Sequence, residues 1–264
     1  MKSDLIYVYC LTENLPEFDS KFKDEGLKSL VIGNFCIVIK YVSGDEFSEE
    51  NFKRNLSNIN WLEKNAREHV EIINSIMEQD TLIPFKFGTI FLSEDSLIKF
   101  IGDYSESLTE NFRHIHGKEE WSVKIYCDRN LMCEQIDELS EESADLEKQI
   151  SASSPGKAFL LKRKKTDLIE NEMDRLCQGY GQEYFDELNN FSEATNINNL
   201  LPKEVTGRED TMILNAAFLV NKNKVLDFTR TADSIGKKEG NSFFFIETTG
   251  PWPPFSFISI KEKH

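Results

Sequence analysis

Positive charge is scarce in this 264-residue sequence, which has 31 Lys and Arg residues against 46 Asp and Glu and a formal net charge of -15. A field of this sign repels nucleic-acid phosphates and anionic lipid surfaces. We therefore expect neither a nucleic acid nor a membrane among the partners. High solubility is the simplest consequence of such an acidic composition.

Long apolar runs are also lacking, since no stretch approaches the roughly 20 apolar residues that a membrane-spanning helix needs. The opening, MKSDLIYVYCLTENLPE, has a short apolar run interrupted by acidic residues, unlike a signal peptide. The five cysteines are widely spread and form no CxxC pair, a pattern typical of reduced thiols. Together these features predict a soluble, cytoplasmic protein.

Motifs for catalysis are missing: the sequence contains no GxSxG, no GxxxxGK[ST] and no GxGxxG. His114 and His116 are the one close histidine pair, and a helix end beside Gly117 explains them better than a metal site. His69 falls on the apolar face of a predicted helix, which favours a core role over a general base. The acidic run at 137–142 is typical of a solvated helix face. We predict no enzyme, no metal and no cofactor.

The first part of the chain alternates strand-like and helix-like patterns. Strands are predicted from β-branched and aromatic runs, and helices from apolar residues spaced by three and four. The elements are strands at 4–11, 27–32, 34–42 and 81–88, a short helix at 16–23, and amphipathic helices at 62–77 and 97–115, the last capped by Ser93 or Ser96. This order predicts a ferredoxin-like split βαβ arrangement with an added helix.

The second part repeats a similar order with a longer first crossover. After a strand at 121–126, apolar residues follow a four-three rhythm on both sides of a break at 151–156, which predicts an antiparallel helical hairpin at about 130–190. The remaining elements are expected to be strands at 200–206, 211–220 and 242–248 and a helix at 222–236. The run at 211–220 is apolar enough for a strand covered on both faces.

These patterns predict an α+β protein with two domains, which its length also favours. Residues 1–117 are expected to form an N-terminal α+β domain, a ferredoxin-like variant. Residues 118–264 are expected to form a C-terminal ferredoxin-like domain enlarged by the helical hairpin.

Two surface features favour contact with a partner. Prolines around Trp252, Phe255 and Phe257 fix an extended path that presents aromatic rings at low entropic cost, although the segment also suits packing over the C-terminal domain. The run 162–165, with Lys162 and Arg163, is the lone basic cluster and indicates either an exposed helix face or a docking patch for acidic groups.

Several blocks of sequence carry a resemblance to a known family. They are Ile6-Tyr7-Val8-Tyr9, the helix with Trp61, Ala66 and His69, Pro84-Phe85-Lys86-Phe87-Gly88-Thr89, Glu120-Trp121-Ser122-Val123-Lys124, Pro155-Gly156-Lys157-Ala158-Phe159-Leu160, Leu214-Asn215-Ala216-Ala217-Phe218-Leu219-Val220, and Thr249-Gly250-Pro251-Trp252-Pro253-Pro254-Phe255-Ser256-Phe257. Through these blocks the chain resembles the gas vesicle protein F/L family nearly end to end. This chain has Lys86 where an arginine is common in the family and Phe255 where a tyrosine is common. The first exchange puts in doubt a bidentate contact of the arginine, and the second a contact of the tyrosine hydroxyl.

The resemblance implies a non-enzymatic accessory protein of gas vesicles, with an N-terminal α+β domain and a C-terminal ferredoxin-like domain and without a cofactor. Its implied partners are the small hydrophobic shell protein and other accessory proteins of the vesicle. It would act as a chaperone-like assembly factor or as a minor component of the vesicle wall.

On this basis we expect Trp252, Phe255 and Phe257 to supply apolar contacts. We expect Arg208 or the basic run to steer an acidic partner. Two alternatives remain: a regulatory protein that binds a small ligand in a cleft between the two lobes, and a metal enzyme that uses His114 and His116.

Overall fold

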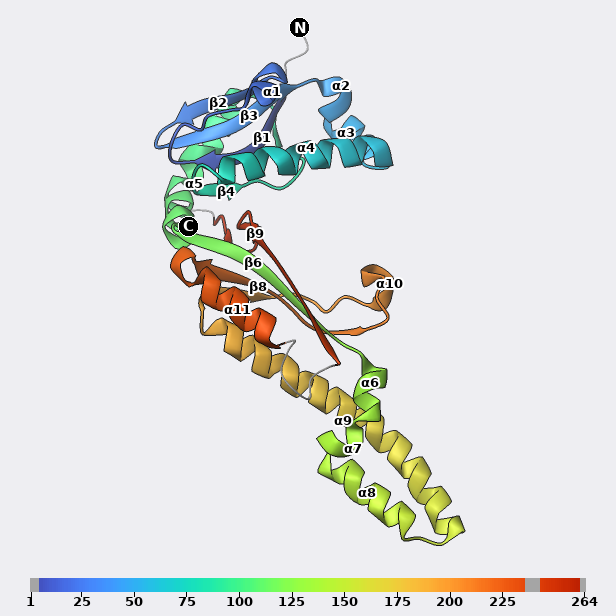
Figure 1. Cartoon of the computed structure of the whole chain (residues 1–264). Helices are drawn as coiled ribbons and strands as arrows, with labels where there is room; N and C mark the ends of the chain where they lie inside the picture. The colour runs from blue at the N-terminus through green and yellow to red at the C-terminus, as the bar shows by residue number, and fades with distance from the viewer. Residues whose placement is uncertain (1–4, 236–242, 262–264) are drawn as a thin grey trace. The chain divides into compact units, whose positions relative to one another are not determined.

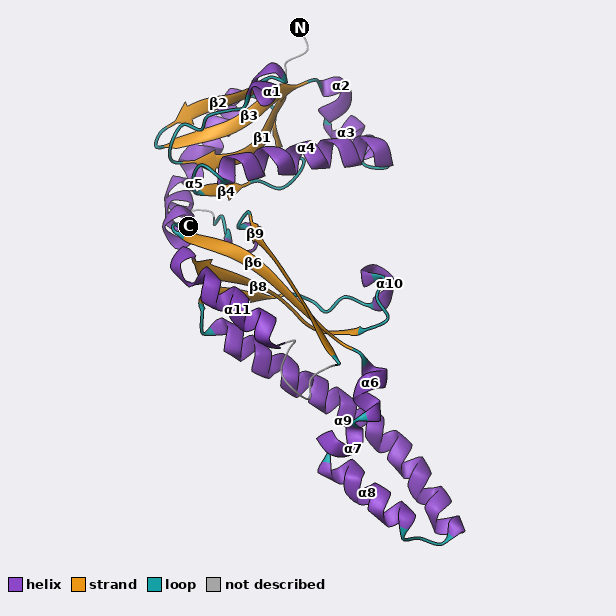
Figure 2. Cartoon of the chain, viewed as in Figure 1, coloured by secondary structure: helices purple, strands orange, loops and turns teal. Residues whose placement is uncertain are grey.

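The structure is a computed structural model that describes residues 5–235 and 243–261. It divides into two compact units, Met1–Glu120 with Pro251–His264, and Trp121–Gly250. Mixed helix and sheet in both units confirm the predicted α+β class, and Figure 2 shows one sheet in each. The ferredoxin-like assignment and the boundary at residue 117 stay predictions.

The first unit contains a five-stranded sheet with the order β2-β3-β1-β4, in which β5 also pairs with β1. The strands are β1 (Leu5–Thr12), β2 (Leu27–Ile32), β3 (Phe35–Val42), β4 (Leu82–Pro84) and β5 (Ile90–Phe91). Antiparallel pairing of β1 with β3 runs from Leu5 opposite Val42 to Thr12 opposite Cys36. Every residue of β1 is buried, so this strand is the centre of the unit.

Five helices accompany this sheet (Figure 1): α1 (Ser20–Asp24), α2 (Gly44–Phe47), α3 (Glu49–Asn55), α4 (Ile59–Met77) and α5 (Glu94–Ile115). Ile72, Ile73 and Ile76 of α4 pack with Tyr7 and Tyr9 on one face of the sheet. The ring of Phe112 on α5 stacks on Phe35 of β3, which points to the opposite face. The sheet is therefore covered on both sides.

Two details of the first unit sharpen the sequence predictions. Ser93 is the N-cap of α5, and its side chain and that of Ser96 form a reciprocal capping box. The strand predicted at 81–88 is shorter, since β4 ends at Pro84; a turn follows in which the Thr89 N–H donates to the Lys86 carbonyl at 3.1 Å and Gly88 has a φ of +82°.

The second unit contains a four-stranded sheet with the order β7-β8-β6-β9. Its strands are β6 (Lys118–Cys127), β7 (Ser192–Ile197), β8 (Thr211–Asn221) and β9 (Phe244–Trp252). Seven consecutive residues of β8, Leu214–Val220, are buried, which confirms a strand covered on both faces. The described part of the predicted helix at 222–236 is a short 3-10 turn, Lys222–Lys224, followed by α11 (Val225–Ile235). Gly236 and Ser242, the ends of two predicted elements, lie outside the described residues.

The strand predicted at 200–206 is wrong. Residues Lys203–Thr206 form the short helix α10, which begins after Pro202 and ends at Gly207 with a φ of +66°. The edge strand beside β8 is instead β7, whose sequence SEATNI is mostly polar. An edge strand buries little surface, so it leaves no apolar alternation to detect.

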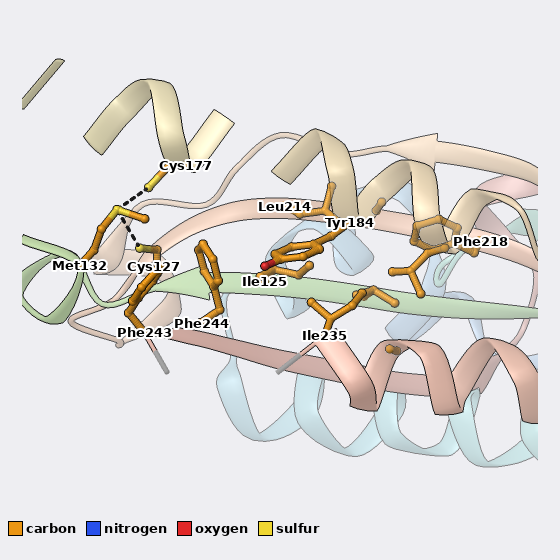
Figure 3. Packing of buried hydrophobic residues seen from close by; sticks show 14 of the residues in the cluster. Ile125, Cys127, Met132, Cys177, Tyr184, Leu214, Phe218, Ile235, Phe243 and Phe244 are labelled. Carbon is orange, nitrogen blue, oxygen red and sulfur yellow. Dashed lines mark hydrogen bonds between the residues drawn. The ribbon is translucent and has the colours of Figure 1, made fainter. Parts of the chain in front are cut away.

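The predicted helical hairpin is present and is built from α6 (Arg129–Glu134), α7 (Ile136–Leu139), α8 (Glu141–Ser151) and α9 (Pro155–Asn189). Figure 1 shows α8 beside the first half of the long helix α9. Pro155 occupies the first turn of α9, where its missing N–H costs no hydrogen bond. The second half of α9 packs with α11 on one face of the sheet, around a core that includes Phe228. Tyr184 and Phe218 of this core are shown in Figure 3. Among the described residues no helix is both long and apolar enough to cross a membrane.

Candidate partner-binding surfaces

The segment 251–259, here called the C-terminal strap, is fastened to the first unit by two buried polar side chains. The Glu120 carboxylate accepts hydrogen bonds from the Ser256 backbone N–H at 3.0 Å and from the Ser256 hydroxyl at 2.6 Å. Asn111 on α5 accepts the Ser259 N–H at 2.9 Å and donates its amide to the Ser259 carbonyl at 2.9 Å. The strap is therefore held by α5 and by the first residues of β6, and its predicted packing over the C-terminal domain stays a prediction.

The strap presents its aromatic residues unequally. Trp252 is 43% exposed and Phe255 is 42% exposed, whereas Phe257 is half-buried. Phe255–Phe257 form a 3-10 turn, with the Phe255 N–H donating to the Pro253 carbonyl at 2.7 Å. A fixed backbone that exposes large apolar rings is suited to protein binding, because little entropy is lost on contact.

Arg208 is occupied within the second unit. Its guanidinium carbon lies 4.4 Å from the ring centroid of Tyr126, and it donates to the Asp210 carboxylate at 2.7 Å. Tyr126 points to the sheet face opposite Ile125 and therefore opposite α9. Because Asp210 balances its charge, Arg208 is poorly placed to attract a distant acidic group. Its predicted role in partner binding stays a prediction.

The basic run on α9 divides into two parts. Lys162 and Arg163 are exposed. Lys165, by contrast, donates to Asp137 at 2.7 Å and to Glu147 at 2.9 Å, and so links α9 to α7 and α8. Part of the run holds the hairpin together, and the other part remains at the surface.

Sequence reasoning missed two apolar residues beside this basic pair. Phe159 is 71% exposed and Leu160 is 67% exposed, in the first turns of α9 after the hairpin break. On a helix, Arg163 shares a face with the residues three and four positions before it, which are Leu160 and Phe159. We call Phe159, Leu160, Lys162 and Arg163 the hairpin-tip patch. The sequence offered a signal for them, because the four-three rhythm of apolar residues after the break at 151–156 begins only at Ile169 and so does not include Phe159 or Leu160.

The predicted site residues thus fall into three groups. Trp252, Phe255 and Phe257 share the strap of the first unit. Lys162 and Arg163 share the hairpin-tip patch of the second unit, and Arg208 is engaged with the face of the second sheet opposite α9.

The histidines show no metal-binding arrangement in the described residues. His114 and His116 are exposed at the end of α5, where His116 is the C-cap. Within residues 5–235 and 243–261, no group of three or more His, Cys, Asp or Glu side chains is arranged to hold a metal. His69 is buried and hydrogen-bonded through both ring nitrogens, which confirms its predicted core role.

The fold and these surfaces define a two-unit α+β protein with exposed apolar and basic features suited to binding other proteins. The chain belongs to the family described as gas vesicle synthesis protein GvpL/GvpF, whose model matches residues 5–259. Membership of this family gives the chain a role in gas vesicle formation.

Individual relatives agree with this assignment. The chain is 25% identical to gas vesicle protein L of Streptomyces sp. (strain CB03234), over 98% of the chain and 94% of that protein. It is 24% identical to gas vesicle protein F of Dolichospermum flosaquae, over 89% of the chain and 90% of that protein. The crystal structure of GvpF from Anabaena sp. PCC7120 has the same fold, with a TM-score of 0.72, 20% identity and coverage of 98% of this chain and 100% of that one.

Proposed function

We propose that this chain is a non-enzymatic accessory protein that binds the hydrophobic shell protein of gas vesicles. It would hold the shell protein before assembly, as a chaperone-like factor, or remain as a minor component of the wall. The observation that carries the proposal is the exposure of Phe159 and Leu160 on the helix α9, beside exposed basic residues, in a block of sequence that carries the resemblance to the family.

The physical reason lies in the properties of a hydrophobic shell subunit. Such a subunit aggregates through its apolar surface unless another protein covers it. Phe159 and Leu160 of the hairpin-tip patch, with Trp252 and Phe255 of the strap, offer apolar contacts on a strongly acidic, soluble chain. Lys162 and Arg163 would attract acidic groups of the partner and help fix its orientation.

The test is retention of the shell protein by the purified full-length chain, compared among variants. One variant replaces Phe159 and Leu160 with serine, and another replaces Trp252, Phe255 and Phe257 with alanine. Val31 and Leu226, each 68% exposed, are matched controls because they lie outside both surfaces.

We expect at least one of the two surface variants to lose most of the retained shell protein while the alanine controls keep it. Circular dichroism checks that every variant remains folded. Equal retention by all folded variants would remove these surfaces from the proposal. Failure of the unaltered chain to retain any shell protein would overturn the proposed function.

A further inference from the structure

Three sulfur atoms meet in the core of the second unit (Figure 3). Cys127 ends β6, Met132 lies on α6, and Cys177 lies on α9. The Met132 thioether sulfur is 3.9 Å from the Cys127 sulfur and 3.9 Å from the Cys177 sulfur. In both contacts the cysteine thiol donates to the Met132 sulfur. All three side chains are buried, so elements far apart in sequence hold the sulfur atoms in place.

The spacing of these atoms fits a particular kind of metal ion. Soft cations such as copper(I) are bound by thiolate and thioether sulfur. Metal–sulfur bonds are about 2.3 Å long, so three sulfurs around one ion in a trigonal plane are about 4.0 Å apart. The two separations from Met132, both 3.9 Å, match this value.

We propose that Cys127, Met132 and Cys177 form a binding site for one soft monovalent metal ion of the copper(I) class. Both thiols release their protons to solvent as the ion binds, and two metal–thiolate bonds and one metal–thioether bond form. The ion enters and remains in the +1 state, so no electron is transferred. The loaded site carries a net charge of about -1, from two thiolates and one cation.

Arg129, in the first turn of α6, lines the same groove as Cys177 and donates to the Asp174 carboxylate at 2.5 Å. Both thiols must lose their protons for the ion to bind.

The site also has a route to solvent within the second unit. Cys177 lines an open groove of about 510 Å³ between α9 and β8, together with Arg129, Asp174 and Gln178. An ion in this groove would meet Cys177 first, before the two sulfurs behind it. A buried sulfur cluster that only fills the core would need no such access.

The experiment measures metal binding by the full-length, reduced chain under anaerobic conditions. Copper(I) is presented with bathocuproine disulfonate as a competing chelator, and silver(I) serves as a probe that does not change oxidation state. The variants are Cys177→Ser, Met132→Leu and, as a control of similar burial in the first unit, Cys36→Ser. Circular dichroism checks the fold of each.

We expect the unaltered chain and Cys36→Ser to take up one tightly held ion. Cys177→Ser should lose affinity by more than ~100-fold and Met132→Leu by about 10-fold. X-ray absorption of the copper(I) form should show three sulfur neighbours. If Cys177→Ser does not fold, the copper(I) affinity of Met132→Leu tests the proposal, because leucine keeps the buried volume of methionine.

The proposal is overturned by any of three results. The unaltered chain takes no copper(I) from the chelator, Cys36→Ser loses as much affinity as the two site variants, or Met132→Leu binds as tightly as the unaltered chain.

Discussion

The phenolic oxygen of Tyr7 lies 3.0 Å from Nδ1 of His69 in the core of the first unit. Nε2 of His69 lies 3.1 Å from the Phe85 carbonyl, which can only accept, so Nε2 carries the ring proton. Nδ1 then accepts the Tyr7 hydroxyl, whose oxygen accepts the Gly88 N–H at 3.0 Å. This chain of bonds joins β1, α4 and the family block 84–89, and it requires a neutral imidazole.

We predict that the stability of the first unit falls between neutral and mildly acidic pH because of His69. Burial lowers the pKa of His69 to about 4, below its usual value of 6.5. Between these values the unfolded chain binds more protons than the folded chain, so stability rises with pH across the window. The contribution is complete above pH 6.5 and is lost as the pH falls to 4. The loss from pH 7.5 to pH 5.0 should be about 2 kcal/mol.

Urea unfolding at pH 7.5 and pH 5.0 measures this effect. His69→Gln serves as the comparison because it cannot titrate, although it is less stable at both pH values. The difference between the two pH values should shrink by about 2 kcal/mol in this variant. An unchanged difference would show that other groups cause the pH dependence.

We predict that Gly88→Ala destabilises the first unit more than Gly33→Ala does. Both glycines have positive φ, +82° and +61°, so both substitutions carry a backbone cost of about 1–2 kcal/mol. A Cβ at Gly88 would also lie 2.4 Å from Cζ of Phe52, whereas one at Gly33 would meet nothing within 4 Å. Phe52→Leu combined with Gly88→Ala should recover part of the extra loss in a double-mutant cycle. Equal unfolding free energies for the two single variants would contradict the steric argument.

We predict that Glu120→Gln loosens the C-terminal strap. A carboxylate accepts both the N–H and the hydroxyl of Ser256, whereas an amide offers only one acceptor oxygen. The cost should be about 1–3 kcal/mol, and faster amide hydrogen exchange over 251–259 would report it. Glu110→Gln, at an exposed position of α5, is the control and should leave exchange of the strap unchanged. If amide hydrogen exchange over 251–259 is as slow in Glu120→Gln as in the unaltered chain, contacts other than Glu120 hold the strap.

We predict that Lys165→Ala weakens the helical hairpin, whereas Lys164→Ala does not. The Lys165 ammonium lies between Asp137 and Glu147 with its side chain 13% exposed. The side chains of Asp137 and Glu147 are 42% and 49% exposed, so removal of their shared cation should cost about 1 kcal/mol. Lys164 is exposed, and its removal should change the unfolding free energy by less than about 0.5 kcal/mol. Similar losses from both variants would exclude a specific role for the bridge.

The pH dependence of the same bridge gives a second readout. Lys165 and Ser143 lower the pKa of Asp137. A carboxylate with a lowered pKa stabilises the fold above its unfolded pKa, and this stabilisation is lost as the pH falls through the folded value. The acid-sensitive part of hairpin stability should therefore be smaller in Lys165→Ala.

The sequence by itself determined the elements that bury much apolar surface. The strands β1, β3 and β8, the helices α4 and α5, and the break at 151–156 were predictable because burial imposes a spacing of two or of three and four residues on the sequence. The same buried and turn-forming blocks carried the resemblance to the gas vesicle family. His69 could also be placed in the core, since it falls among the apolar positions of α4.

Only the tertiary structure decided the features that depend on contacts between distant residues. Ser256 meets Glu120 across 136 positions, and Cys177 meets Met132 across 45. Polar β7 becomes a strand only because β8 offers it backbone partners. Lys165 is one charge of a basic run in the sequence, but its charge is balanced by Asp137 and Glu147, which the fold brings close. Such contacts leave no local period in the sequence, because each one depends on a single pair of side chains rather than on a repeating face.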